Sequence, residues 1–61
     1  METRTEIVSG TTAGMLQINA AQFDCDIVEL GVVGNGKARI TVSGTAENIT
    51  ALFDYINEAA E

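Results

Sequence analysis

Residues 45–61 read T-A-E-N-I-T-A-L-F-D-Y-I-N-E-A-A-E, and this stretch decides the fold. Its apolar side chains recur with the 3.6-residue period of an α-helix, so they form one stripe that a helix would bury. The stripe consists of Ile49, Leu52, Phe53, Ile56, Ala59 and Ala60. Gly44 ends the preceding strand, and Thr45 is a favourable N-cap. The sequence therefore predicts a C-terminal amphipathic helix that packs one face against the rest of the chain.

The opposite face of this predicted helix is purely acidic. At about 100° per residue, its four acids lie within roughly 60° of one another. They are Glu47, Asp54, Glu58 and Glu61. No Lys or Arg occurs in residues 45–61, and the like-charged i,i+4 pair Asp54 and Glu58 costs the helix roughly 0.2–0.5 kcal/mol. Because stability does not explain these acids, we interpret them as candidate partner-binding residues.

Length and composition limit the class of protein. The 61 residues allow one domain, 1–61, with a core of marginal size, which a homodimer or a tight partner would complete. One Cys and no His exclude an intrachain disulfide and a structural zinc site. Nine acids against three basic residues give a net charge of −6. This charge argues against direct binding of nucleic acid or an anionic membrane, and it favours a basic protein surface as the partner.

The chain shows no targeting signal. No apolar run approaches the roughly 18 residues that span a bilayer, and residues 1–8 lack the pattern of a signal peptide. A single Cys is typical of a reducing compartment, so we expect a cytoplasmic protein.

The first half of the chain predicts a β-hairpin. Residues 3–9 are rich in β-branched side chains, which favours a strand. Residues 10–14 begin and end with Gly, as a turn does, and residues 15–20 alternate apolar and polar side chains. Pairing Ile7 with Leu16 keeps the apolar side chains of both strands on one face.

Residues 27–33 and 37–43 predict a second hairpin around Gly34-Asn35-Gly36. A two-residue Asn-Gly turn is the usual first choice and would pair Val33 with Ala38. A three-residue loop gives three apolar pairs instead: Val28 with Val42, Leu30 with Ile40, and Val32 with Ala38. We prefer the three-residue loop because a one-residue slip reverses every side chain, and only this register separates apolar from polar residues.

Together these elements predict an α+β fold, a four-stranded antiparallel sheet (two hairpins) with one C-terminal amphipathic helix packed on one face. The side chains predicted to face the helix are Ile7, Leu16, Ile18, Val28, Leu30, Val32, Ile40 and Val42. The other face of the sheet would carry four apolar residues that form a possible second interface. These are Val8, Met15, Ile27 and Val33.

The chain lacks the residues of common catalytic sites. Without His there is no Ser-His-Asp or Cys-His pair. Cys25 lies between Asp24 and Asp26, whose charges disfavour a reactive thiolate, and two carboxylates alone are a weak signal for Ca²⁺ or Mg²⁺. Gly34-Asn35-Gly36 precedes a predicted strand rather than a helix, which disfavours a phosphate loop. We therefore expect no enzymatic activity, no cofactor and no metal.

Two segments resemble known families. Residues 14–23, G-M-L-Q-I-N-A-A-Q-F, and 42–52, V-S-G-T-A-E-N-I-T-A-L, resemble the start and end of the histidine-containing phosphocarrier protein, whose phosphorylated His this chain lacks. Residues 30–42, L-G-V-V-G-N-G-K-A-R-I-T-V, resemble the central hairpin of the carbon storage regulator family of RNA-binding β dimers. Each resemblance covers part of the chain, so we transfer no function from either.

The acidic stripe leads to the preferred functional hypothesis. A chain of this kind would be a small protein-binding module, an inhibitor that docks its acidic helix face on a basic nucleic-acid-binding surface. In size, acidity and lack of catalytic residues the chain is similar to small phage-encoded anti-CRISPR proteins. The alternatives are a self-associating structural or assembly module, or a small oligomeric protein that binds a metabolite.

Overall fold

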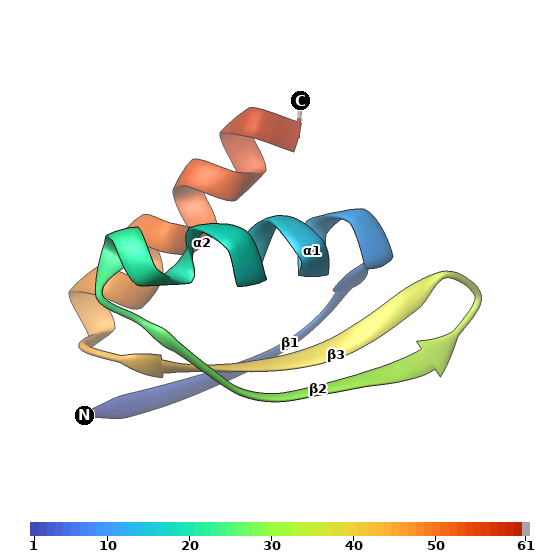
Figure 1. The fold of residues 1–61 in the computed structure, drawn as a ribbon, viewed down its shortest axis with the longest axis horizontal. Coiled ribbons are helices and arrows are strands. Elements are labelled where there is room, and N and C mark those ends of the chain that lie inside the picture. Colours follow the sequence, from blue (N-terminus) through green and yellow to red (C-terminus); the bar gives the residue numbers. More distant parts are fainter. Residues whose placement is uncertain (61) are drawn as a thin grey trace.

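The computed structural model describes residues 1–60 of the chain, and the side chains of residues 1–59. Three strands, two α-helices and one short 3-10 helix occur in these residues. In order they are β1 (Glu2–Ser9), α1 (Gly10–Asn19), the 3-10 helix η1 (Ala20–Phe23), β2 (Asp26–Gly34), β3 (Lys37–Gly44) and α2 (Ala46–Ala60). Both helices cover the same face of the sheet, which leaves the other face open (Figure 1). The fold is therefore α+β, as predicted.

The prediction of a four-stranded sheet made of two hairpins is wrong. The sheet has three strands in the order β1-β3-β2, and residues 10–20, which were expected to form a turn and a strand, belong to α1 and the start of η1. Ile7 lies opposite Arg39 on β3 rather than opposite Leu16. Both outer strands run antiparallel to β3 and hence parallel to each other. Parallel strands need a crossover of a dozen or more residues, which residues 10–25 provide.

Helix α1 forms because a side chain caps its N-terminus and because its buried residues recur with a helical period. The Ser9 side chain is the N-cap and accepts a hydrogen bond of 3.1 Å from the Thr12 backbone N–H. Ala13, Leu16 and Ala20 recur at helical spacing and are buried. The alternation that predicted a strand depended on Ile18, which is 81% exposed on the outer side of α1.

The hairpin of β2 and β3 combines the two registers that the sequence offered. The preferred three-residue loop is wrong, because the turn has two residues, Asn35 and Gly36, both with positive φ, and Gly34 pairs with Lys37. Irregularities at Val28 and Val33 then shift β2 against β3. As a result the predicted pairs of Leu30 with Ile40 and Val32 with Ala38 are confirmed, whereas the predicted pair of Val28 with Val42 is wrong because Ile27 occupies that position.

Helix α2 confirms the prediction made from residues 45–61. The Thr45 hydroxyl accepts a hydrogen bond of 3.1 Å from the Asn48 N–H and caps the helix. The predicted stripe residues that are buried are Ile49, Leu52, Phe53 and Ile56. Ala59 is exposed, and the side chain of Ala60 lies outside the described ones. The α2 residues pack with Leu16, Ile40 and Val42 into one core between the helices and the sheet.

The two predicted faces of the sheet need correction, because they assumed a strand at residues 15–20. Of the eight side chains expected to face the helix, five are exposed: Ile7, Ile18, Val28, Leu30 and Val32. Leu30 and Val32 nevertheless lie on the predicted face, because they pair with the buried Ile40 and Ala38. Of the four residues of the possible second interface, Val8, Met15 and Ile27 pack against the core instead, and Val33 is exposed. These four therefore do not form one outer surface. None of the described helices combines the length and apolar composition needed to cross a membrane.

Candidate functional site

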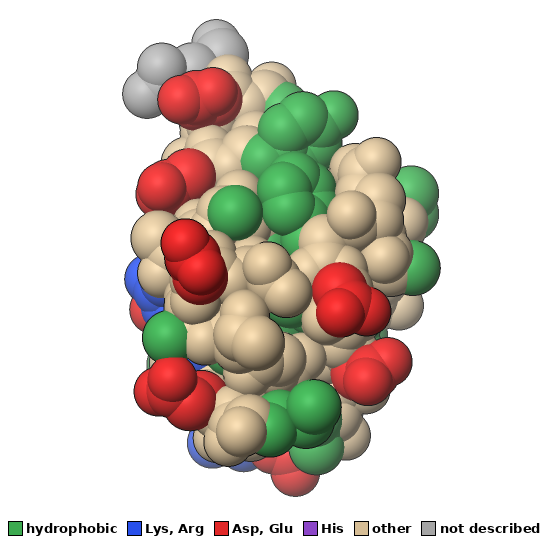
Figure 2. Space-filling model, turned by 90° about the vertical axis from the view of Figure 1, so that its left-hand side faces the viewer, with side chains coloured by type: hydrophobic (Ala, Val, Ile, Leu, Met, Phe, Trp, Pro, Cys, Tyr) green, Lys and Arg blue, Asp and Glu red, His purple; other side chains and the backbone are tan. Residues whose placement is uncertain are grey.

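The outer face of α2 carries three of the four predicted partner-binding residues. Glu47, Asp54 and Glu58 are all exposed on this helix, and Glu61 lies outside the described residues. No basic residue occurs between Ala46 and Ala60, so these carboxylates have no counter-charge on their own helix. Seen from the end of the molecule where α2 begins, acidic side chains are spread over much of the surface (Figure 2).

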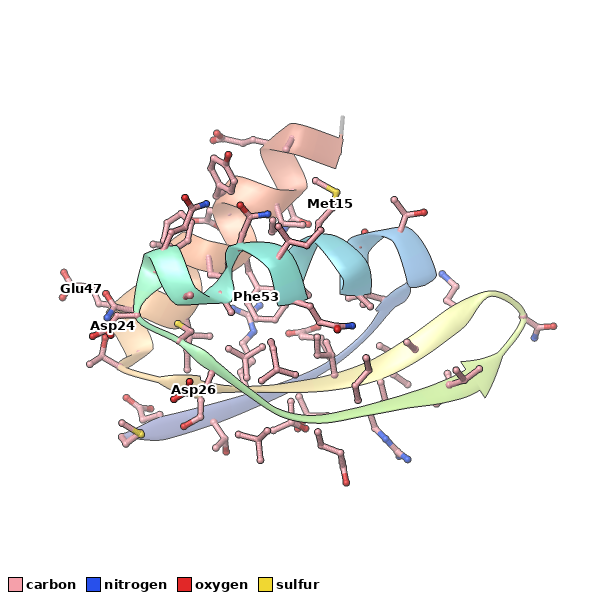
Figure 3. All side chains as sticks on the ribbon, viewed as in Figure 1. Met15, Asp24, Asp26, Glu47 and Phe53 are labelled. Carbon is pink, nitrogen blue, oxygen red and sulfur yellow. The ribbon has the colours of Figure 1, made fainter. Side chains whose placement is uncertain are left out.

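The fold adds two acids that the sequence had not connected to α2. Asp24, which follows η1, and Asp26, the first residue of β2, lie at the same end of the molecule as Glu47 (Figure 3). Asp24 has a left-handed backbone, φ 56°, and the Cys25 N–H donates a hydrogen bond of 2.9 Å to the Ala20 carbonyl. This tight turn, packed beside α2, brings the two carboxylates to that end. We call Asp24, Asp26, Glu47, Asp54 and Glu58 the acidic surface.

The basic residues lie away from the acidic surface or are already paired. The Arg4 guanidinium forms an ion pair of 2.8 Å with Glu6 and lies 4.4 Å from the ring centre of Phe53. Lys37 and Arg39 are at the turn end of β3, whereas Asp26 pairs with the opposite end of that strand at Ser43. The distribution of charge in the molecule is therefore asymmetric: acidic residues predominate near the start of α2, and the basic residues Lys37 and Arg39 lie near the β2–β3 turn.

Cys25 is a structural thiol rather than a nucleophile. Its side chain is buried, and its Sγ donates a 3.4 Å hydrogen bond to the Phe23 carbonyl. Burial, and then the charges of Asp24 and Asp26, raise the pKa of the Cys25 thiol above its ordinary value of 9.0. A thiol that holds its proton this firmly is a poor nucleophile and a poor metal ligand at neutral pH.

We expect the Cys25 thiol to react with a disulfide reagent far more slowly in the folded chain than in denaturant. Folding raises the thiol pKa, so the folded chain binds this proton more tightly than the unfolded chain. The contribution of Cys25 to the free energy of unfolding should therefore be constant well below pH 9.0 and should fall as the pH rises above this value. Urea titrations on both sides of this value measure the effect, with Cys25→Ala as the control that lacks it. Equal labelling rates in folded and unfolded chains would contradict the assignment.

A shallow cavity of about 210 Å³ lies between the N-terminal part of β1 and the start of α2. It is lined by Glu2, Thr3, Arg4, Ala46, Ile49 and Thr50. Ligand pockets usually measure about 300–1,000 Å³, so this hollow is small for a substrate. Within the described part of the chain, no three side chains of the ligating types come together as a metal site.

Comparison of the chain with protein-family models, with curated proteins and with solved structures finds no match. The acidic surface is consequently interpreted from its own geometry. Five exposed carboxylates without bound counter-charges can attract a cationic surface over several ångströms, and they can pair with Lys or Arg side chains on contact. The sequence identified the three that share α2, because helical period alone places them together. It missed Asp24 and Asp26, because only the packing of η1 beside α2 brings them near Glu47.

Proposed function

We propose that this chain is a protein-binding module whose acidic surface docks on a basic protein surface, in particular one that binds nucleic acid. By occupying such a surface, the module would act as an inhibitor of the protein that carries it. Phosphate groups and carboxylates present similar targets to Lys and Arg side chains, so an acidic protein can compete with nucleic acid for one basic site. We expect this to take place in the cytoplasm, where the single thiol stays reduced.

One observation supports this proposal most directly: acids from two separate segments converge on one end of the molecule, where the nearby base, Arg4, is already paired with Glu6. Glu47 and Glu58 are 11 positions apart, which spans about 16 Å along a helix that rises 1.5 Å per residue. Asp24 and Asp26 widen the acidic surface to one side of that line. A surface of this width matches several phosphates of a nucleic-acid strand, which carries one charge per about 3.4 Å of helix axis, although the surface is less densely charged. Electrostatic steering toward a basic target requires only the concentration of charge.

The test is capture of basic proteins by the immobilised chain, compared between two variants of equal net charge. Glu47→Gln, Asp54→Asn and Glu58→Gln together change the charge from −6 to −3, because −6 + 3 = −3. The control combines Thr11→Lys, Gln17→Lys and Ile18→Lys, three exposed neutral positions of α1 outside the acidic surface, and also has −6 + 3 = −3. We expect the parent chain and the control to capture proteins from the cation-exchange fraction of a cell lysate, and the neutralised variant to lose them.

Salt and competition complete this test. Capture through the acidic surface should weaken steeply as the salt concentration rises, since exposed charges are screened. Double-stranded DNA should compete with the chain for the captured protein. If the neutralised variant captures as much as the control, or if captured proteins are not basic, the acidic surface is only a solvated face of α2 and the proposal is wrong.

A further inference from the structure

The two edges of the sheet differ in how well they are protected against pairing. The outer strand β1 carries charges at Glu2, Arg4 and Glu6, which discourage pairing with another chain. The outer strand β2 is largely apolar, and four of its large side chains are exposed. These are Val28, Leu30, Val32 and Val33. An apolar edge strand of this kind is a template for a further strand.

The exposed apolar residues on β2 result from where the helices pack. Leu30 and Val32 lie opposite Ile40 and Ala38, so they point to the helix-covered side of the sheet. The two α-helices pack on β1 and β3, and η1 is the helical element that packs with β2. Leu30 therefore stays 44% exposed and Val32 87% exposed, although their neighbours on β3 are buried.

Gly31, in the middle of β2, has no explanation within the chain. A Cβ at this position would meet nothing within 4 Å, and Gly31 is not among the glycines with positive φ. A glycine inside a strand weakens that strand, and it often marks the close approach of another backbone or ligand. The neighbouring position on β3 is Arg39, for which the described residues provide no carboxylate within ion-pair distance.

We propose that a second copy of this chain pairs with β2 in antiparallel orientation, centred on Leu30, to give a six-stranded sheet with all helices on one side. A two-fold axis normal to the sheet keeps the helix-covered faces together, so each residue must pair with one on the same face. Centring on Glu29 would place two like charges opposite each other, and centring on Gly31 would place Glu29 opposite the apolar Val33. Centring on Leu30 places Leu30 opposite its own copy and Glu29 opposite Gly31 of the second copy.

This register produces complementary charge on the open face. In each chain Arg39 lies beside Gly31, so the order across the sheet becomes Arg39, Gly31 and then Glu29 of the second copy. The backbones at Arg39 and at Glu29 of the second copy are about 10 Å apart, at about 4.8 Å per strand. Gly31 lies between them and has no side chain that would keep the long side chains of Arg39 and Glu29 apart. The two-fold axis generates a second, equivalent pair of Arg39 and Glu29.

The same register repeats this pattern toward the turn. Asp26 comes opposite Gly34 of the second copy, and Gly34 is itself paired with Lys37. In one copy the irregularity at Val28 lies between Leu30 and Asp26, and in the second copy the irregularity at Val33 lies between Leu30 and Gly34. The two β2 strands therefore contribute the same number of residues, so Asp26 stays opposite Gly34. Two acids of β2 thus face the two bases of β3 across two glycines, and Leu30 and Val32 become covered. This surface shares Asp26 with the acidic surface but none of its other residues, and the inference does not depend on the proposed function.

The first test is the oligomeric state, measured by sedimentation over a range of concentrations. We expect a dimer for the parent chain. Arg39→Glu and Glu29→Arg should each weaken the dimer about tenfold or more, because each reversal acts twice across the axis, and the double variant should restore it. Ile18→Glu, a charge on the exposed side of α1, should leave the dimer unchanged. A monomer at all concentrations, or a double variant no better than the single ones, would overturn the proposal.

The second test reads the register directly by cross-linking. In a Cys25→Ala background, Leu30→Cys places two thiols on opposite residues, within the roughly 4.4–6.8 Å between Cα atoms that a disulfide spans. Val32→Cys is more exposed, but its two copies would be four residues out of register, about 13 Å apart. We expect rapid oxidation to a covalent dimer for Leu30→Cys only. Faster cross-linking of Val32→Cys would show that this register is wrong.

Discussion

Replacing Leu16 with Ala should unfold much of the chain, whereas replacing Ile18 with Ala should leave its stability almost unchanged. Leu16 is fully buried in the core, and removing a buried Leu side chain costs about 2–5 kcal/mol. A domain of this length has a total stability of about 3–9 kcal/mol at 0.05–0.15 kcal/mol per residue. Ile18 is 81% exposed, and substitutions at such sites change stability by about 0.5 kcal/mol or less. Urea denaturation followed by far-UV circular dichroism measures both.

The contrast between the two variants discriminates between a helix and a strand at residues 10–19. In a strand, positions 16 and 18 point to the same face, so both substitutions would remove buried area and both would be costly. In a helix they are 200° apart, so only one of them reaches the core. Similar losses of stability for Leu16→Ala and Ile18→Ala would contradict the helical assignment of α1.

The error at α1 has a physical cause that is visible in its residues. Four of five residues from Met15 to Asn19 alternate apolar and polar side chains as a strand does, and Gly10 and Gly14 resemble the ends of a turn. The helix signal was weaker, because Ala13 and Ala20 contribute small side chains to the buried face. Ser9 as an N-cap, with Ala13, Leu16 and Ala20 at helical spacing, was the signal that could have identified α1.

The second half of the chain was predictable because its patterns are strong and local. Ile49, Leu52, Phe53 and Ile56 match the helical period without an exception, and all four are buried. In the hairpin, the apolar pattern correctly predicted the pair of Leu30 with Ile40, but the three-residue loop that we preferred because of this pattern is wrong, and the two-residue Asn-Gly turn forms instead. The bulge at Val33 reconciles the two, and a bulge of one residue leaves no mark in composition or periodicity.

The candidate sites also differ in whether local sequence or tertiary packing brings their residues together. Glu47, Asp54 and Glu58 are grouped by the period of one helix, so sequence alone could group them. Asp24 joins them only because η1 packs beside α2. The exposed β2 edge could not be foreseen either, since a fourth strand was expected and the position of each strand in the sheet depends on how α1 crosses it.

Replacing Gly44 with Ala should destabilise the fold by about 1–3 kcal/mol, the usual cost of inserting a methyl group into a packed interior. Gly44 is buried at the end of β3, and a Cβ there would lie 3.0 Å from the Cys25 Sγ, closer than van der Waals contact. Its φ is not positive, so the loss would arise from lack of space and not from backbone strain. Urea denaturation of the variant measures the loss.

Two companion variants make the origin of this loss testable. Gly14→Ala in α1 introduces the same methyl group where nothing lies within 4 Å, and Ala in place of Gly inside a helix should stabilise by about 0.5–1 kcal/mol. Combining Gly44→Ala with Cys25→Ala removes the sulfur that the new Cβ would contact, and the remaining neighbours lie at 3.5 Å or more. The double variant should therefore be more stable than the sum of the two single losses predicts. Strict additivity would mean that the turn at Cys25 and the end of β3 can move apart without cost. The close packing that fixes Asp24 and Asp26 beside α2 would then be loose, and the acidic surface would lack the rigidity that favours the proposed docking.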